Sequence, residues 1–302
     1  MSSSNSNHDL VAGYVPKATL SYVGIACYGL LALVFWFNFF RHGRKYMLTL
    51  CISALTMAIG FGIRIPLSTN PTSSGIYIGY TLFTLLSPCG FIATEYILLP
   101  RIAALIHAED CLFLSSRKIV RIFVGSDITT FFLQAAGGGM TTAKGNMANI
   151  GKWLSLVGLV AQCVSFGIFI LLAVMFMVRV SARYPEKWSN VTTTGLDNRP
   201  VTLNRLEDWT TVYYTIMYAA VGIMARCIFR VVEYAMGRDG YLRSTEWCVF
   251  VLDHLPLFLA IMIWTVIWPP MVLERDDRFA HRVVMGDHAL AYVSSNGNEN
   301  KV

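Results

Sequence analysis

The feature of this sequence that most limits its fold is a series of seven apolar runs, each about long enough to cross the hydrocarbon core of a bilayer as a helix. Backbone groups in lipid must bond within a helix or a closed barrel, and these runs are continuously apolar rather than alternating. The sequence therefore predicts an all-α, polytopic membrane bundle of seven transmembrane helices. The runs cover residues 18–40, 46–65, 76–99, 119–140, 153–178, 209–235 and 246–268.

The composition agrees with a body that lies mostly in lipid. Only 14% of the 302 residues are charged, whereas soluble domains carry about 25%. A formal net charge of +6 is also found in nucleic-acid-binding proteins, but here Lys and Arg are spread over short loops between the apolar runs. Membrane topology explains this excess better, so the expected partners are membrane lipids and no nucleic acid.

The loop charges predict an orientation. If the loops after the first, third and fifth runs share one side with the C-terminal tail, that side carries fourteen Lys and Arg residues and the other side five. The positive-inside rule then places the N-terminus outside and the C-terminus in the cytoplasm. We expect an extracellular segment 1–17, a transmembrane domain 18–268 and a cytoplasmic, disordered tail 269–302. A glycan on the sequon at 190–192 would contradict this orientation.

Ionisable side chains inside the apolar runs are the candidate functional residues, because one charge at mid-bilayer costs about 2.5 to 3.5 kcal/mol on translocon scales. In the sixth run Arg226, Arg230 and Glu233 are spaced i, i+4 and i+7, so a helix presents them on one face. They need partners or water. The alternative is a purely structural interpretation, in which they reach the headgroups and lock helices together.

The seventh run supplies matching acids. Glu246 and Asp253 are seven residues apart and are expected to share a helix face, with His254 next in sequence. A short turn joins the sixth and seventh runs near the outer leaflet, so the arginines and these acids are predicted to meet there. Arg64, near the outer end of the second run, is expected to join the same region.

Two further acids lie in the third and fourth runs. Asp127 and Gln134 form a polar stripe with Phe131 and Gly138, and three consecutive glycines end the run. Asp127 is interpreted either as the partner of an arginine or as a protonatable group, while the glycines alone favour a close-packed helix end. Glu95 follows the break at residues 88–90 and is predicted to lie toward the cytoplasmic half.

These motifs resemble the fungal lipid-translocating exporter family, also called the RTA-like or aminocholesterol-resistance family. The stretch Asp-Ile-Thr-Thr-Phe-Phe-Leu-Gln-Ala-Ala-Gly-Gly-Gly at 127–139 is the most specific match, and Arg-Cys-Ile-Phe-Arg-Val-Val-Glu at 226–233 is the second. The resemblance covers about 14–269. Glu95 and His254 depart from the pattern. The resemblance implies a fungal membrane protein, usually at the plasma membrane, that exports or flips amphipathic lipids and confers resistance to toxic lipids or drugs.

The residues independently fit such a transporter. An amphipathic amine, such as a sphingoid base, needs a carboxylate partner when its head is buried. The candidates are Asp127, Glu233, Glu246 and Asp253. We expect a lateral groove in which acids hold the headgroup while Phe and Leu side chains contact the hydrocarbon chain.

The sequence also bears on two other classes of function. A seven-helix lipid or stress sensor without transport activity fits the same topology and stays open. An enzyme is not expected, because clustered histidines typical of intramembrane zinc sites are absent and only His254 lies clearly within an apolar run. No Gly-rich phosphate loop or nucleophile elbow occurs. Neither a metal nor a cofactor is predicted.

Overall fold

The computed structural model describes residues 18–42, 44–70, 73–141, 145–185, 209–237 and 246–273. Across these ranges every regular element is helical, and seven helices are long and apolar enough to cross a membrane. The predicted all-α bundle with seven spans is confirmed. The predictions for segment 1–17, for the sequon and for the tail beyond residue 273 lie outside the described residues.

The first six spans are each dominated by one long helix, and the seventh is built from short pieces, the last of them at 269–273. The 38 residues of α5 make a helix of about 57 Å, longer than the hydrocarbon core of about 30 Å. The spans are α1 (Ala18–His42), α2 (Leu48–Thr69), α3 (Ser74–Leu105), α4 (Ser116–Met140), α5 (Asn146–Arg183), α8 (Trp209–Met236) and, in the seventh, α10 (Glu246–Val249), η4 (Phe250–His254), α11 (Leu255–Met262) and η5 (Ile263–Thr265).

Several span boundaries differ from those predicted, since α3 continues to Leu105 rather than to 99 and α5 begins at Asn146 rather than at 153. Helix α5 continues to Arg183, past the predicted end at 178, because its last turns carry the basic residues that suit the headgroup layer. The seventh span runs to Leu273 rather than to 268. Pro269 and Pro270 are buried there, so this stretch belongs to the helical body and not to a solvated tail.

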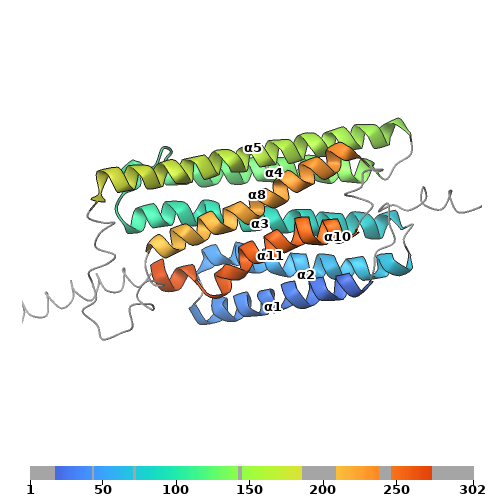
Figure 1. Cartoon of the computed structure of the whole chain (residues 1–302), viewed down its shortest axis with the longest axis horizontal. Helices are drawn as coiled ribbons and strands as arrows, with labels where there is room; N and C mark the ends of the chain where they lie inside the picture. The colour runs from blue at the N-terminus through green and yellow to red at the C-terminus, as the bar shows by residue number, and fades with distance from the viewer. Residues whose placement is uncertain are drawn as a thin grey trace, which may run out of the picture.

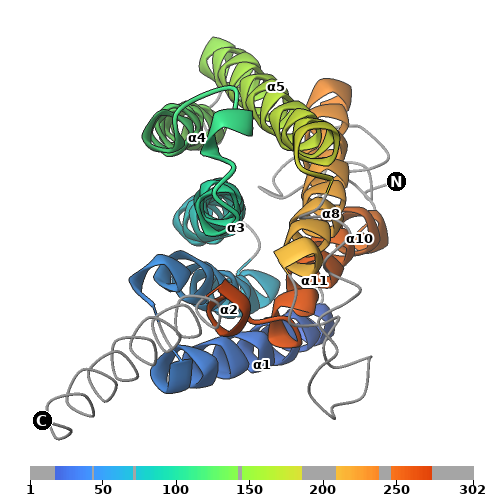
Figure 2. The same ribbon diagram turned by 90° about the vertical axis from the view of Figure 1, so that its left-hand side faces the viewer.

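The helices run side by side along the long axis of the molecule (Figure 1). Seen end-on, α4 and α5 lie together on one side, α1 and α2 lie on the other, and α3 lies between these pairs (Figure 2). Helix α8 packs against α3, α5 and α11. Helix α3 therefore connects the two pairs, and α8 joins α3 and α5 to the seventh span.

Apolar side chains cover the outside of the bundle as well as its core. Phe61 and Phe166 are fully buried, whereas Leu33 and Val221 are 70% and 69% exposed. A soluble protein rarely exposes so large a contiguous apolar surface. This distribution is typical of helices whose outer faces contact lipid.

Glycines bring α4 and α5 into backbone contact. A Cβ added at Gly137 would lie 2.7 Å from the carbonyl oxygen of Gly151, while one added at Gly139 would meet no atom within 4 Å. Close backbone approach through small residues is common in membrane helix pairs. The structure thus agrees with the close-packed helix end expected for this glycine run.

The two glycines provide a matched pair of substitutions. We expect Gly137→Ala to lower the free energy of unfolding by about 1 to 3 kcal/mol, since the new methyl group forces the two backbones apart. Gly139→Ala is expected to be neutral or to stabilise the helix by up to about 1 kcal/mol. Thermal unfolding of both variants in detergent measures the difference, and equal melting temperatures would contradict the close contact.

Candidate functional site

The first group of buried ionisable residues is an ion-pair cluster of Arg226, Arg230, Glu233 and Asp253. Asp253 is fully buried, and Arg230 binds its carboxylate with two hydrogen bonds, from Nε at 2.9 Å and from Nη2 at 2.7 Å. Arg226 Nη1 lies 3.1 Å from Asp253 Oδ2, and Arg230 Nη1 donates to Glu233 at 3.1 Å. Bidentate, charge-assisted pairs of this kind are the strong ones. The cluster therefore joins α8 firmly to the seventh span.

A π-helical turn places Asp253 in this position. In η4 the backbone N–H of Leu255 bonds to the carbonyl of Phe250, five residues back, and Pro256 follows with no N–H to donate. Such a turn leaves carbonyl groups without helical partners. Tyr28 donates its hydroxyl to the carbonyl of His254 at 2.9 Å, and Arg226 donates to that of Asp253 at 3.4 Å.

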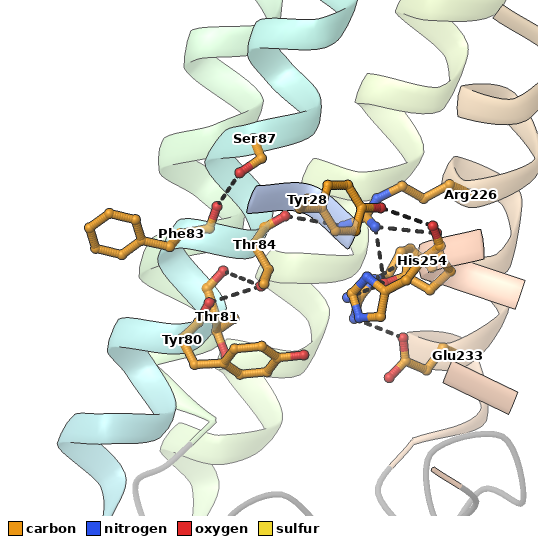
Figure 3. A network of polar contacts seen from close by, with 11 residues as sticks. Tyr28, Tyr80, Thr81, Phe83, Thr84, Ser87, Arg226, Glu233 and His254 are labelled. Carbon is orange, nitrogen blue, oxygen red and sulfur yellow. Dashed lines mark hydrogen bonds and ion pairs between the residues drawn. The ribbon is translucent and has the colours of Figure 1, made fainter. Parts of the chain in front are cut away.

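Side chains from four spans meet around this turn. Figure 3 shows Arg226, Tyr28 and His254 converging beside α3, where Arg226 Nη2 donates to the carbonyl of Thr84 at 3.1 Å. The His254 ring packs edge-on against Phe61, with ring centroids 4.9 Å apart. The π turn is thus supported by tertiary contacts from α1, α2 and α8, and Arg226 in turn is bound by α3.

Arg64 reaches this region from α2, as its position near the outer end of the second run predicts. Its side chain is 1% exposed, its guanidinium carbon lies 5.0 Å from the centre of the Phe250 ring, and Nη1 is 3.4 Å from the hydroxyl of Ser21. With Arg230 and Glu233 it lines a polar cavity of about 40 Å³. That volume has room for about one water molecule and not for a lipid headgroup.

Glu246 is the first residue of α10, but its side chain lies outside the described residues. The predicted shared face of Glu246 and Asp253 assumed a regular α-helix between them. The π turn changes the helical phase within that interval, so residues seven positions apart there need not share a helix face.

The second group consists of the buried acids Asp127 and Glu95. They are 2% and 1% exposed, and no hydrogen-bond partner for either carboxyl group exists within the described parts of the chain. The hydroxyl of Tyr96 lies beside Asp127 but makes no well-aligned bond to it. Of the two interpretations of Asp127, the structure does not provide the arginine partner. An unpaired buried acid is costly and calls for an explanation.

A line of hydrogen-bonded polar groups continues from Asp127 along α4. Gln134 Nε2 donates to Gln162 Oε1 at 2.8 Å, and Gln162 Nε2 lies 3.5 Å from the sulfur of Cys89. Asp127, Thr130 and Gln134 share the buried face of α4, while Phe131 is only half-buried. Sequence reasoning missed Gln162, although a glutamine in the middle of the long fifth apolar run was a usable signal.

The candidate acids differ in whether an arginine neutralises them, a difference that their positions in the sequence do not show. Glu233 and Asp253 are neutralised by arginines, whereas Asp127 and Glu95 have no such partner among the residues that the structure describes. The structure also contains no group of three His, Cys, Asp or Glu side chains suited to a metal ion in the ranges it describes.

Comparison with known proteins places these groups in a family. The sequence model described as RTA1 like protein matches residues 50–276, which include all four members of the ion-pair cluster and both unpaired acids. The chain belongs to the RTA1-like family. The resemblance predicted from residues 127–139 and 226–233 is confirmed. No solved structure matches this RTA1-like chain.

Several curated relatives of this RTA1-like protein come from Saccharomyces cerevisiae. Protein RTA1 is 33% identical over 70% of this chain and 62% of its own length. Protoporphyrin uptake protein 1 is 30% identical over 69% and 64%, and the sphingoid long-chain base transporter RSB1 is 24% identical over 88% and 74%. The chain spans less than two thirds of the length of the first two.

The family and the seven spans together identify an integral, multi-pass membrane protein. Where the printed name of a relative states an activity, that activity is transport or uptake rather than chemical conversion. These activities are those that the names of the relatives print.

Proposed function

We propose that this protein moves amphipathic amines of the sphingoid-base type across a fungal plasma membrane, and that Asp127 holds the amine during passage. Glu95 supplies a second acid on α3. The observation that supports this function is that both buried carboxyl groups lack a hydrogen-bond partner within the part of the chain that the structure describes. An ammonium group would supply the missing charge and hydrogen bonds at such a site.

The ion-pair cluster has a different role in this proposal. Arg226 and Arg230 already neutralise Asp253, and Arg230 also binds Glu233. Removing either side of such a pair would leave an uncompensated buried charge. We assign the cluster to helix packing, and this leaves Asp127 and Glu95 as the acids that are free to bind a substrate.

The same distinction favours an amine over a carboxylate-bearing amphiphile. A buried anionic head would need an unpaired guanidinium or ammonium group, and Arg226 and Arg230 are both engaged by acids. Asp127 and Glu95 would repel a second carboxylate. The charge balance of these residues thus supports a cationic head.

Transport by the purified, full-length protein in liposomes tests this function. The probe is a fluorescent sphingoid base, and the matched control is its N-acylated form, which has the same hydrocarbon chain and no amine. We expect the base to cross faster than in protein-free vesicles and the acylated form to cross at the background rate. A pH gradient across the vesicle reveals whether the movement is proton-coupled.

Each alternative gives a different result in this assay. Equal movement of both probes would contradict recognition of the amine by an acid. Binding of the base without any movement would contradict transport and select the lipid sensor instead.

A further inference from the structure

An apolar groove runs along the outer face of α4 and α5. Its volume is about 860 Å³, and its walls include Ile122 on α4 and Val160, Val164 and Ile168 on α5. Both helices are membrane spans, so this groove opens to lipid and not to water. An apolar lining of this kind can bind a hydrocarbon chain.

The floor of the groove lies close to the unpaired acid. Phe123 and Ser126 line the groove, and Asp127 follows Ser126 in sequence. Phe123 is 4% exposed, and its ring centre lies 5.2 Å from that of Tyr96, whose hydroxyl lies beside Asp127. Phe123 and Asp127 are also i and i+4 on one helix face. Phe123 therefore lines the groove and also contacts Tyr96, the residue whose hydroxyl lies beside Asp127.

The far end of the groove is unsuitable for a cation. Phe113 lines that end, and Arg179 lies over its ring at 5.3 Å. The nearby acid, Asp110, is already paired with Arg183 at 3.3 Å and accepts a hydrogen bond from Tyr184 at 3.1 Å. This hydrogen bond raises the pKa of Tyr184. A cationic head is repelled here and is directed toward Asp127.

We propose that the groove between α4 and α5 binds the hydrocarbon chain of the amine from the lipid phase, and that Phe123 is the barrier that must turn aside before the amine reaches Asp127. This inference rests on the proposed function, since it names the route of the same substrate. The groove supplies apolar contact for the chain, and the acid behind Phe123 supplies the charge for the head.

Photo-crosslinking in liposomes tests the position of the chain. A sphingoid base with a diazirine in its hydrocarbon chain is irradiated with the full-length protein, and labelled peptides are mapped. We expect labelling within residues 113–126 and 153–172, and competition by unlabelled base but not by its N-acylated form. Labelling elsewhere, or equal competition by the N-acylated form, would overturn the proposal.

A filled groove gives a second, independent measurement. Val160→Trp places a large side chain in the groove, and Val221→Trp places the same side chain on an outer face of α8 that does not line it. We expect Val160→Trp to lose most of the labelling and to slow movement of the base severalfold, with Val221→Trp unchanged. Wild-type movement with Val160→Trp would refute the groove alone, whereas an inactive wild-type protein would refute the proposed function.

The barrier itself is tested with leucine substitutions. Phe123→Leu and Phe169→Leu both remove a ring from the same aromatic cluster, but only Phe123 lines the groove. We expect Phe123→Leu to speed movement of the base severalfold and Phe169→Leu to leave the rate unchanged. Equal effects of the two substitutions would contradict a specific role for Phe123.

Discussion

Asp253→Asn is expected to lower the free energy of unfolding by about 3 to 5 kcal/mol, because it leaves two buried arginines without their shared counterion. Asp253 is fully buried and is bonded to both Arg226 and Arg230. The amide of asparagine supplies one acceptor oxygen and no charge. Thermal or denaturant unfolding in detergent measures the loss, and a large part of the protein is expected to fail to fold at all.

The exposed pair of Asp110 and Arg183 provides the control. Its side chains are 43% and 66% exposed, so Asp110→Asn is expected to change stability by less than about 1 kcal/mol. Equal stability of the Asp110 and Asp253 variants would show that the cluster contributes little to folding. Adding Arg230→Gln to Asp253→Asn should cost less than the sum of the single changes, since the two residues are coupled.

The seven spans could be predicted because each depends on one local property, a continuous apolar run. The meeting of Arg226, Arg230, Glu233 and Asp253 was also predictable, since helical spacing and a short connection bring the sixth and seventh spans together. Both inferences use information that lies within one or two neighbouring segments of the chain.

The π turn at Phe250–His254 could not be predicted in the same way. Pro256 signals a disturbance of the helix, but the structure that results depends on donors from distant segments, the hydroxyl of Tyr28 and the guanidinium of Arg226. Spacing rules assume a constant helical period, and the turn changes that period beside the acid of interest. The pairing of each acid is likewise a tertiary property.

Among the described residues, some of the buried acids are paired with arginines and others are not, and this difference, which the sequence spacing did not reveal, has a functional consequence. Asp127 and Asp253 are both buried aspartates in membrane spans, yet Asp127 lacks a hydrogen-bond partner in the described ranges and Asp253 has two arginines. Evolution of a packing contact favours full compensation of a buried charge, whereas a binding site must keep some of its polar capacity unused until the ligand arrives. We therefore expect the Asp→Asn substitution to reduce stability at residue 253 and to reduce transport, but not stability, at residue 127.

Asp127→Asn is expected to slow movement of a sphingoid base by about 10- to 100-fold while leaving the melting temperature nearly unchanged. A hydrogen bond to a charged group contributes about 1.5 to 3 kcal/mol, which corresponds to this range, and no arginine within the described residues would lose its counterion. The liposome assay measures the rate.

Thermal unfolding with added base gives a readout that does not depend on transport. A ligand that binds only the folded state stabilises it by about 2.7 kcal/mol at a hundred times its dissociation constant. Wild-type protein should show this stabilisation and Asp127→Asn should lose it, while Asp110→Asn keeps it because that acid is already paired at the surface. A variant lacking the Asp127 carboxylate that still bound and moved the base normally would exclude this residue as the headgroup site. An Asp127 variant that unfolded as readily as Asp253→Asn would instead assign Asp127 to folding. A carboxyl group that makes no hydrogen bond in the empty protein is not expected to stabilise it.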